Sequence, residues 1–549
     1  MIGASRQTYT PQKPLLPGRW ASMVFGVLCG AFMMPCAYSA SFGFIRTETQ
    51  AVVDTGADLV FSVDTRNGDL TSMRFKGEEL QTTEPKASQI ASGLGTAQVD
   101  VRTAGDVMVV SIRHGDLIHY YMAHKGRDAI YMATYAPTLP PVGELRFVAR
   151  LNVNALPKAD RGTDSNVGQA IEGNDVFLLP DGRTSSKFYS ARPMIDDPVH
   201  GVSGPGVAVY MLMGNRERSS GGPFFKDIAT QKTAKTHELY NYMYSNHTQT
   251  EPYRAGLHGV YGLLFATGGK PSAQLTDLGF VTNALGLEGY LDAAGRGSVS
   301  GHSSGVPATL PAFIGLSNAT AQYWTQPKTS GDFQLTGVRP GRYRITLYQN
   351  ELEVAQSTVD VVAGSDREAN LQADPPAGRV KWQIGTPDGT PAGFRNAGQL
   401  ASAHPSDSRM APWEATTFSV GSSPLNDFPA VQWRDVNTPT RINFELHTNE
   451  VRNYRLRMFI SLTQAGGRPQ LTVNQRWTAP VPPAPNQPES RGITRGTYRG
   501  NNTLFEVSIP GSAFQPGLNS LDIGVASGKT GAGFLSPAIV FDSVQLIED

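Results

Sequence analysis

The sequence predicts an all-β protein, and three observations support this fold class. Only 17% of the 549 residues are charged, whereas glycine occurs 58 times and proline 38 times, a composition rich in turns. Short runs in which apolar and polar residues alternate recur along the chain, and few segments keep a helical period for long. One core rarely serves a chain of this length, so we expect about two to four domains.

The first domain is predicted from paired strands joined by turns. Alternating runs at 57–63 and 69–75 flank Thr65-Arg66-Asn67-Gly68, in which the Asn-Gly pair is a strong hairpin signal. Similar strand patterns follow at 107–113, 117–122, 129–135 and 144–151. We therefore expect residues 40–285 to form one large antiparallel β-sandwich.

Two further units are predicted after it. Strand patterns at 331–335, 338–348 and 352–361 alternate around a Pro-Gly turn, and the size of the unit at 286–374 suits a fibronectin type III-like sandwich. Asp374-Pro375-Pro376-Ala377-Gly378 is typical of a linker, and the remainder, 375–549, is again rich in strand patterns. We interpret its proline-rich piece at 480–488 as a surface loop, because the flanking segments are too short to be separate domains.

The N-terminal segment has the pattern of an export signal. A positively charged stretch precedes an apolar run at 20–34, and small residues around Ala37-Tyr38-Ser39-Ala40 offer a cleavage site. We predict a signal peptide at 1–39 and a secreted, extracellular protein, with the periplasm as the alternative compartment and an uncleaved anchor as the competing interpretation. Both cysteines, Cys29 and Cys36, lie in this segment, so the mature chain would hold no disulfide and no thiolate nucleophile.

The charge balance argues against some classes of partner. Lysine plus arginine and aspartate plus glutamate each total 47, so the formal net charge is +0. This balance does not favour a general nucleic-acid binder, nor a membrane-surface protein once the signal has been cleaved. We expect a monomer.

One stretch combines aromatic and titratable residues. Tyr240, Tyr242 and Tyr244 would stack on one face of a strand that runs into His247 and then Glu251. Aromatic faces stack on sugar rings, and an imidazole with a pKa near neutrality is a natural proton donor or acceptor. The competing interpretation is a core row of tyrosines at a sheet edge with a surface histidine.

Three further pieces place charged residues near predicted strands. Arg146 and Arg150 would share one face of the strand at 144–151, and Lys187 lies among hydroxyl and aromatic residues. Arg254 and His258 follow the aromatic stretch closely. Taken one at a time, each is more often a solvated basic residue or a structural histidine.

Longer motifs make the sequence similar to a known family, the rhamnogalacturonan lyases (rhamnogalacturonan endolyases) of the fungal rhamnogalacturonase B type, polysaccharide lyase family 4. The resemblance covers essentially the whole mature chain. It is carried by Asp54-Thr55-Gly56-Ala57, Gly77-Glu78-Glu79-Leu80-Gln81, Gly143-Glu144-Leu145-Arg146-Phe147, Ile171-Glu172-Gly173-Asn174-Asp175-Val176-Phe177, Ser186-Lys187-Phe188-Tyr189-Ser190, Ser219-Ser220-Gly221-Gly222-Pro223-Phe224, Gly393-Phe394-Arg395-Asn396, His404-Pro405-Ser406-Asp407-Ser408-Arg409-Met410, Gly466-Gly467-Arg468-Pro469-Gln470 and Thr494-Arg495-Gly496-Thr497-Tyr498-Arg499-Gly500.

The resemblance implies a large catalytic antiparallel β-sandwich, a fibronectin type III-like sandwich and a jelly-roll domain like a carbohydrate-binding module. It implies cleavage, by β-elimination, of the bond from rhamnose to O4 of galacturonate in the rhamnogalacturonan I backbone of pectin. The chain departs from the family in lacking the cysteines of fungal members, and at Gly385-Thr386-Pro387-Asp388-Gly389, where an aromatic residue is usual. By position in the matching motifs, the catalytic residues fall on Lys187 and His247, and the substrate-binding residues on Arg146, Tyr240, Tyr242 and Glu251.

The chemistry explains these residue types. Elimination removes the weakly acidic C5 proton beside a carboxylate, and the charge of that carboxylate must be neutralised. No dense Asp cluster for calcium is evident, so Arg146 is the candidate for a bidentate clamp on the carboxylate. Lys187 would be the base, with its pKa lowered by burial and a cation such as Arg146. His247 would protonate the departing oxygen, oriented by Glu251, although the two roles could be swapped or a tyrosine could take part. No cofactor is expected for catalysis, and a structural calcium ion in the third domain is an expectation without a ligand set.

Two other functions stay in view. A non-catalytic pectin-binding protein on the same scaffold is disfavoured because Arg146, Lys187 and His247 are all retained. A glycoside hydrolase would need two opposed carboxylates, and Glu251 has no obvious carboxylate partner in the aromatic stretch.

Overall fold

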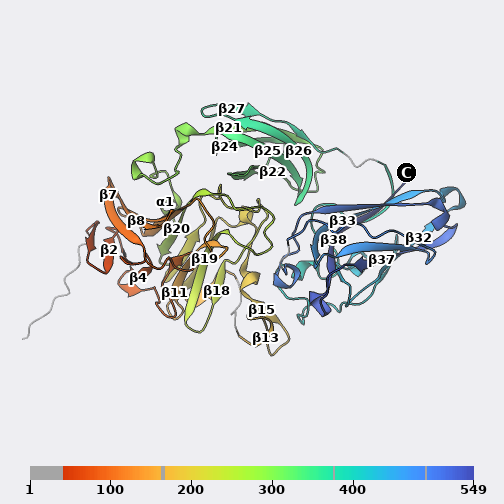
Figure 1. Ribbon diagram of the computed structural model, residues 1–549, viewed down its shortest axis with the longest axis horizontal. Coiled ribbons are helices and arrows are strands. Elements are labelled where there is room, and N and C mark those ends of the chain that lie inside the picture. Colours follow the sequence, from red (N-terminus) through yellow and green to blue (C-terminus); the bar gives the residue numbers. More distant parts are fainter. Residues whose placement is uncertain (1–40, 162–166, 375–377, 489–490, 549) are drawn as a thin grey trace, which may run out of the picture. The chain divides into compact units, whose positions relative to one another are not determined.

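The computed structural model describes residues 41–161, 167–374, 378–488 and 491–548 (Figure 1). The expected signal peptide at 1–39, with both cysteines, lies outside these residues. In the part of the chain that is described, no helix is both long and apolar enough to cross a membrane. Its regular elements are strands and short 3-10 helices together with one α-helix of a single turn, α1 (Ala273–Thr276), which confirms the all-β prediction.

The first domain is built from twenty strands within the described residues. The six strands expected from the sequence are all present, with ends shifted by no more than two residues. Those expected at 57–63, 69–75, 107–113, 117–122, 129–135 and 144–151 are β3, β4, β8, β9, β10 and β11. In chain order the strands are β1 (Gly43–Arg46), β2 (Gln50–Asp54), β3 (Leu59–Asp64), β4 (Leu70–Phe75), β5 (Glu78–Glu79), β6 (Gln89–Ile90), β7 (Gln98–Ala104), β8 (Val107–His114), β9 (Leu117–His124), β10 (Ala129–Ala136), β11 (Leu145–Asn152), β12 (Lys158–Ala159), β13 (Gln169–Glu172), β14 (Val176–Leu178), β15 (Thr184–Ser186), β16 (Val199–Gly204), β17 (Val207–Leu212), β18 (Thr230–Lys232), β19 (Thr236–Tyr244) and β20 (Gly256–Ala266). Two 3-10 helices, η1 (Lys187–Ser190) and η2 (Met194–Asp196), interrupt them.

These strands form four sheets among the described residues, and every pairing in them is antiparallel. The largest has the order β12-β16-β17-β20-β10-β9-β8-β7 and faces a five-stranded sheet, β1-β2-β3-β4-β5, and a four-stranded sheet, β18-β19-β11-β6, across a shared core. The smallest, β13-β14-β15, leads into η1. The four-stranded sheet is the one that carries the aromatic stretch.

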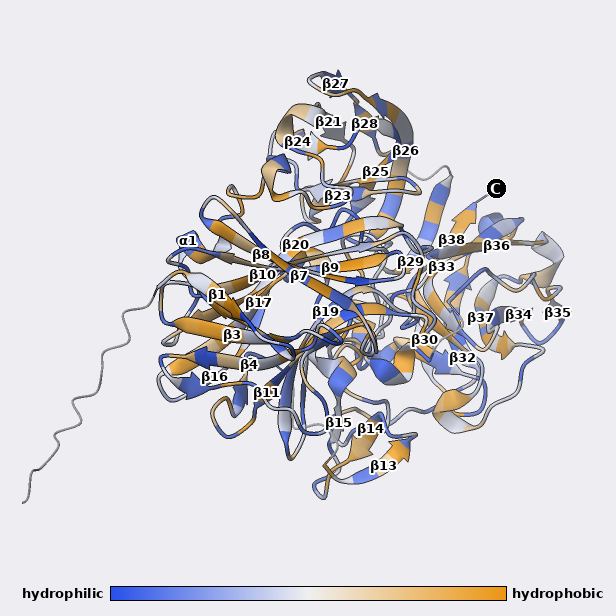
Figure 2. Ribbon diagram, turned by 60° about the vertical axis from the view of Figure 1, so that its left-hand side comes forward, coloured by the Kyte–Doolittle hydropathy of each residue, from blue (hydrophilic) through white to orange (hydrophobic). Residues whose placement is uncertain are grey.

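The main core follows from alternation along the strands. Leu59, Phe61 and Val63 on β3 are fully buried, whereas the residues between them are more accessible, which places one face of β3 inward. Figure 2 colours the strands by the hydropathy of their residues. The turn after β3 needs glycine at Gly68, because its φ is +80° and a Cβ would approach the Ile112 side chain to 2.4 Å. The hairpin signal in the sequence therefore predicted both the strands and their connection correctly.

The second domain is a smaller sandwich whose two sheets enclose their own core. It follows η3 (Asn283–Leu285) and η4 (Ala293–Gly295) and contains β21 (Gly297–Ser304), β22 (Ala312–Ser317), β23 (Gln322–Thr325), β24 (Asp332–Val338), β25 (Gly341–Gln349), β26 (Leu352–Val361), β27 (Asp366–Glu368) and β28 (Leu371–Gln372). One sheet has the order β24-β21-β27, with β28 also on β21, and the other β23-β22-β25-β26. The strand expected at 338–348 starts later, at Gly341, because Val338 ends β24 and the Pro340 turn intervenes.

A buried ion-pair cluster joins the first two domains. Glu217 of the first domain is 3% exposed, and its carboxylate accepts hydrogen bonds from Arg296 at 2.7 Å and Arg339 at 2.6 Å. Burial opposes ionisation, but the hydrogen bonds and charges of these arginines outweigh it and lower the pKa of Glu217 to about 2. The cluster therefore holds a charged carboxylate over the whole neutral range.

The third domain is a two-sheet sandwich around a core that includes Trp433, Phe428 and Phe541. Its strands are β29 (Arg379–Gly385), β30 (Thr417–Ser419), β31 (Val431–Trp433), β32 (Thr440–Leu446), β33 (Tyr454–Gln464), β34 (Arg468–Val473), β35 (Trp477–Thr478), β36 (Thr503–Ile509), β37 (Gly517–Ala526) and β38 (Ala538–Glu548). Its 3-10 helices are η5 (Ala397–Gln399), η6 (Leu425–Asp427), η7 (Thr448–Glu450), η8 (Ile493–Arg495), η9 (Gly511–Ala513) and η10 (Gly533–Leu535).

The sheets of this domain have the orders β29-β38-β33-β36, with β31 on β38, and β30-β32-β37-β34-β35. The proline-rich piece at 480–488 runs without regular structure from β35 in one sheet to β36 in the other. It is therefore a loop within the domain, as predicted. Of the expected linker, residues 375–377 lie outside the described residues.

Candidate functional site

The antiparallel pair of β11 and β19 supplies the face on which the site is built. The two arginines of β11 lie on this face, as predicted, and β19 places tyrosines and a glutamate opposite them. The direct cross-strand partners are Arg146 with Tyr242, Val148 with Tyr240, and Arg150 with Glu238. A small apolar cluster of Val148, Val176, Phe188, Tyr189, Ile228, Tyr240 and Tyr242 packs beneath the site and ties β11 and β19 to β14 and η1.

The tyrosines of β19 do not form the expected row of three. Tyr240 and Tyr242 stack, with ring centroids 5.6 Å apart, and both are buried. Burial raises the pKa of both phenols, so they stay neutral. Tyr244 instead meets Tyr253 edge-on at 5.4 Å and packs on the main core, because a register shift makes Met243 an extra residue in β19. The prediction was therefore wrong for Tyr244.

His247 lies in the turn after β19 and is held by an aspartate that sequence reasoning did not identify. Its Nδ1 is 2.8 Å from Oδ1 of Asp227, whose other carboxylate oxygen accepts a hydrogen bond from the Ser245 hydroxyl. Burial disfavours the imidazolium, but the charge and hydrogen bond of Asp227, with the charge of Glu144, outweigh it and raise the pKa of His247. Because Asp227 takes Nδ1, Nε2 is the nitrogen left for chemistry.

Glu144 connects this histidine to Arg146. Oε2 of Glu144 is 2.9 Å from Nη1 of Arg146, and Oε1 is 3.8 Å from Nε2 of His247. The same Nη1 donates a hydrogen bond of 2.5 Å to the Tyr242 hydroxyl. Among the described residues, the hydrogen bonds and ion pairs of the Arg146 guanidinium use Nη1, so Nη2 can meet an incoming carboxylate.

Lys187 begins η1, where the Ser186 side chain caps the turn by accepting a hydrogen bond from the Phe188 backbone. Its Nζ is 3.3 Å from Oδ1 of Asp175 and 5.7 Å from the centroid of the Phe188 ring. The same ring meets His247 edge-on at 5.0 Å, so the lysine and the histidine are both neighbours of Phe188. The charged partner of Lys187 is therefore the carboxylate of Asp175 and not the expected cation, Arg146.

The third domain also reaches this site. Nη2 of Arg495 in η8 is 2.6 Å from Oδ2 of Asp175, and its guanidinium lies 4.9 Å from the centroid of the Phe188 ring. The Tyr189 hydroxyl, one residue further, donates a hydrogen bond of 3.1 Å to the backbone carbonyl of Thr494. Asp175 is thus shared between Lys187 and Arg495. The motif that contains Arg495 was part of the family resemblance, but its position beside Lys187 is a tertiary feature.

Glu251 does not orient His247, in contrast to the expectation. Oε2 of Glu251 accepts hydrogen bonds from the Gly221 backbone at 2.6 Å and from Arg254 at 2.8 Å. Burial opposes ionisation, yet these contacts hold the pKa of Glu251 below its ordinary value. Asp227 performs the predicted orienting function, because it lies across the turn from His247 and forms the bond to Nδ1.

Lys226, next to Asp227 in the chain, is a second candidate that sequence reasoning missed. It lines two small cavities together with His247 and Thr248. Burial, only partly offset by the charge of Glu351, lowers the pKa of Lys226 to about 8. The only signal in the sequence was its place two residues after the motif that ends at Phe224.

The remaining residues singled out from the sequence have structural roles. Nε of Arg150 is 3.0 Å from the Glu238 carboxylate, and Arg254 is taken up by Glu251. His258 is 1% exposed, and burial lowers its pKa to about 3, so it is a neutral core histidine. His258 is therefore a structural histidine, as the competing interpretation held, whereas Arg150 and Arg254 are largely buried ion-pair partners and not solvated basic residues.

The site as a whole carries more positive than negative side chains, and it is open to solvent at Arg146, Lys187 and His247, which are 23%, 27% and 19% exposed. Such a cluster favours an anionic ligand. No group of three or more His, Cys, Asp or Glu residues in the described ranges is placed to hold a metal ion. The positive residues are Arg146, Lys187, Lys226, His247 and Arg495, and the acidic ones are Glu144, Asp175 and Asp227.

Three family models match the chain in succession. Residues 42–289 match the N-terminal region of rhamnogalacturonan lyase B, residues 295–369 match domain II of polysaccharide lyase family 4, and residues 380–546 match domain III of that family. The second and third models support the fibronectin-like and carbohydrate-binding-module-like character of the two smaller domains.

Curated relatives match over nearly their full length. The chain is 43% identical over 514 residues to the probable rhamnogalacturonate lyase A of Aspergillus fumigatus, which covers 93% of this chain and 96% of that protein. It is 41% identical to rhamnogalacturonate lyase A of Emericella nidulans over 95% and 99% of the two chains, and 41% identical to that of Aspergillus aculeatus over 94% and 98%. Among solved structures, Paenibacillus xanthan lyase matches with a TM-score of 0.21 and 10% identity over 93% of this chain and 52% of that one, too low a score to indicate a shared fold.

Proposed function

Because the chain belongs to the rhamnogalacturonan lyases of polysaccharide lyase family 4, we propose that it cleaves the rhamnogalacturonan I backbone of pectin by β-elimination. The linkage cleaved is the one that joins rhamnose to O4 of galacturonate; elimination breaks its C4–O4 bond, and the new non-reducing end is an unsaturated galacturonate. The observation that supports this proposal most directly is the network in which Glu144 joins Arg146 to His247 beside Lys187.

Arg146 is proposed to bind the galacturonate carboxylate. A guanidinium on that carboxylate lowers the energy of the enolate-like state that forms when the C5 proton leaves. Its Nη1 is already held by Glu144 and Tyr242, so the guanidinium has a defined orientation before substrate arrives. Tyr240 and Tyr242 are proposed to support the sugar site from below. Glu251 is proposed to contact sugar units of the polymer that lie further from the cleaved linkage.

Lys187 is proposed as the base that takes the C5 proton. Its amine is held 3.3 Å from Asp175, and Arg495 contacts the same carboxylate at 2.6 Å. The third domain thereby takes part in positioning the proposed base. Lys226 is the alternative base, because burial lowers its pKa to about 8 and it lines cavities with His247.

His247 is proposed as the acid that protonates the departing O4. Its raised pKa, which Asp227 and Glu144 cause against the effect of burial, keeps a proton available on the ring. The electron pair of the C5–H bond forms the C4–C5 double bond as the C4–O4 bond breaks. The proton from His247 completes the hydroxyl of the released rhamnose.

The test is the ultraviolet absorbance of mature protein incubated with rhamnogalacturonan I, with homogalacturonan as control substrate and a chelator in parallel. We expect absorbance to rise with the first substrate only, and the rise to be unaffected by the chelator. Lys187→Ala and His247→Ala should abolish it with circular dichroism unchanged. New reducing ends without absorbance would indicate hydrolysis, and binding without either signal would indicate a non-catalytic pectin-binding protein.

We further propose a signal peptide at 1–39, secretion to the extracellular space and a monomeric enzyme that needs no cofactor for catalysis. The proposed domain limits are 40–285 for the catalytic sandwich, 286–374 for the fibronectin type III-like domain and 375–549 for the jelly-roll domain. Mass spectrometry of the secreted protein would locate the new N-terminus, and light scattering would give the mass in solution. A structural calcium ion in the third domain remains a prediction that metal analysis of the purified protein would test.

A further inference from the structure

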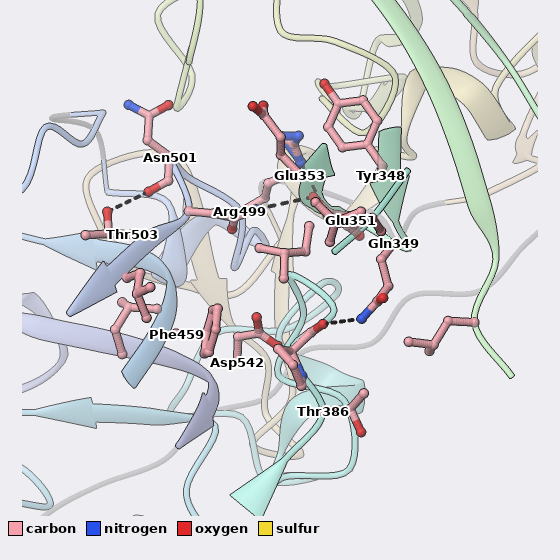
Figure 3. A pocket seen from close by; sticks show the side chains of 18 of the residues that line it. Tyr348, Gln349, Glu351, Glu353, Thr386, Phe459, Arg499, Asn501, Thr503 and Asp542 are labelled. Carbon is pink, nitrogen blue, oxygen red and sulfur yellow. Dashed lines mark hydrogen bonds and ion pairs between the residues drawn. The ribbon is translucent and has the colours of Figure 1, made fainter. Parts of the chain in front are cut away.

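A large cavity of the described chain does not include Lys187 or Arg146 in its lining. It has a volume of about 940 Å³ and is lined by residues of all three domains (Figure 3). This volume lies at the upper end of the range of ~300–1,000 Å³ typical of small-molecule sites, so it can accept more than one sugar ring. The catalytic residues Arg146, Lys187 and His247 are not among its lining residues, and the proposed reaction makes no use of most of it.

One wall is an apolar strip on the outer face of the β29-β38-β33-β36 sheet. Phe459 of β33 and Leu504 of β36 are direct cross-strand partners, and both line the cavity with Val380. Leu504 and Val380, on the two edge strands of this sheet, are 45% and 40% exposed, which is high for large apolar side chains in one cavity lining. An aromatic ring flanked by aliphatic side chains suits the C–H face of a pyranose.

The other lining groups are mainly amides, hydroxyls and carboxyls. Figure 3 shows Gln349, Asn501 and Thr503 among the residues that line the cavity with Phe459. Gln545, also in the lining, is 1% exposed, and its Oε1 is a buried acceptor without a hydrogen-bond partner among the described residues. A buried acceptor without a partner is costly, so this oxygen awaits a donor such as a sugar hydroxyl.

The charges of the cavity differ from those of the catalytic site. Its two arginines are paired with lining glutamates, Arg499 with Glu351 at 3.3 Å and Arg344 with Glu353 at 3.9 Å. Burial raises the pKa of a further lining carboxyl, Asp542, to about 8, so that group is a neutral hydrogen-bond donor at lower pH. Carboxyl groups outnumber arginines in the lining, and an anionic uronate chain would be repelled.

The cavity meets the catalytic region at one end. Thr250 and Arg499 line it and also line the small cavity that contains His247 and Lys226. A sugar chain bound in the large cavity would therefore lie close to the backbone segment that undergoes cleavage.

We propose that this cavity is a binding site for a neutral, uncharged oligosaccharide, stacked on Phe459 and hydrogen-bonded by Gln545 and its amide neighbours. The ligand is either a neutral side chain of the polysaccharide substrate or a separate neutral glycan. Both sources present the same hydroxyl-rich, uncharged surface.

The test is calorimetric titration of the full mature protein with galactotetraose, arabinotetraose and digalacturonate. Neutral tetraoses lack a uronate and cannot undergo β-elimination, so binding is measured independently of the lyase activity. We expect a neutral tetraose to bind more tightly than digalacturonate. Phe459→Ala should weaken that binding at least tenfold, while Arg146→Ala should leave it unchanged.

Leu518→Ala is the matched control, because Leu518 is 59% exposed on β37 in the other sheet of the same domain. This variant should bind the tetraose as the wild type does. The proposal is overturned if neither tetraose binds, if Phe459→Ala binds equally well, or if Arg146→Ala abolishes binding. The KM for rhamnogalacturonan with and without neutral side chains separates the two sources. A KM raised by Phe459→Ala on the branched polymer alone assigns the side chain, and an unchanged KM assigns a separate glycan.

Discussion

Replacement of Asp227 by asparagine tests the proposed acid directly. Asp227→Asn keeps the size of the side chain and one oxygen to accept from the Ile228 backbone, and puts an amide group where the other oxygen accepts from the Ser245 hydroxyl. It removes the charge 2.8 Å from Nδ1 of His247. Burial alone then dominates, and the pKa of His247 should fall. A buried neutral imidazole cannot protonate the departing oxygen.

The size of the effect follows from the contact. An opposite charge within hydrogen-bonding distance typically shifts a pKa by roughly 1–3 units, so the alkaline limb of kcat/KM should move to lower pH by about that amount. Near neutral pH the rate should drop by about 10²–10⁴-fold, the usual contribution of a general acid. Glu144, whose Oε1 is 3.8 Å from Nε2, retains part of the charge stabilisation and argues for the lower end of that range.

The assay is the initial rate of absorbance increase on rhamnogalacturonan I as a function of pH. Asp332→Asn is the matched control, because Asp332 forms a similar 3.0 Å pair with His302 on the surface of the second domain and should leave the profile unchanged. The reasoning would be refuted if Asp227→Asn kept the alkaline limb of the wild type or retained full activity.

The same pair has a consequence for stability. The folded-state pKa of His247 is raised above its unfolded value of 6.5, so its contribution is complete below that pH and disappears as the pH rises through the raised folded pKa. The loss of stability in Asp227→Asn should therefore be larger in mildly acidic than in alkaline solution. Urea denaturation at several pH values would measure it, and a loss that grows toward alkaline pH would contradict the assignment.

Three further outcomes are expected. Lys187→Ala should lower kcat by at least about 10²-fold with folding intact, while Lys226→Met should keep most of the wild-type kcat. If Lys226→Met abolishes activity and Lys187→Ala keeps it, and the acid limb of the wild-type pH profile lies near pH 8, Lys226 is the base. Arg495→Ala should remove one of the two cations that hold Asp175, loosen the position of Lys187 and lower kcat/KM, and an unchanged kcat/KM would separate the third domain from catalysis. Glu217→Gln should cost roughly 3 kcal/mol of unfolding free energy above pH 4.5, a difference that shrinks as the pH falls from 4.5 to about 2, and a pH-independent difference in urea denaturation would contradict it.

The strands were predictable because their signals are local. Alternation of apolar and polar residues marked β3, β8 and β26 to within two residues of their ends, and Asn67-Gly68 marked the connection after β3. The error at β25 was also local: the Pro-Gly turn belongs before the strand, since proline offers no backbone N–H to the sheet.

The site was only partly predictable. Arg146, Lys187 and His247 came from motif positions, and the structure brings them to one face. Asp227 was missed because it lies 20 residues before His247, with nothing in the spacing to connect them. Tyr244 was misplaced because a register shift in β19 cannot be read from an alternating pattern.

The sequence by itself determined the all-β class, the hairpin signals and the family, since each depends on residue types and their order along the chain. The tertiary structure alone decided that Asp227 rather than Glu251 holds His247, that Asp175 is shared between Lys187 and Arg495, and that Gln545 borders a large cavity. The physical reason is that ion pairs and hydrogen bonds act over a few ångströms in space. Partners this close can be hundreds of residues apart in the chain, as Asp175 and Arg495 are.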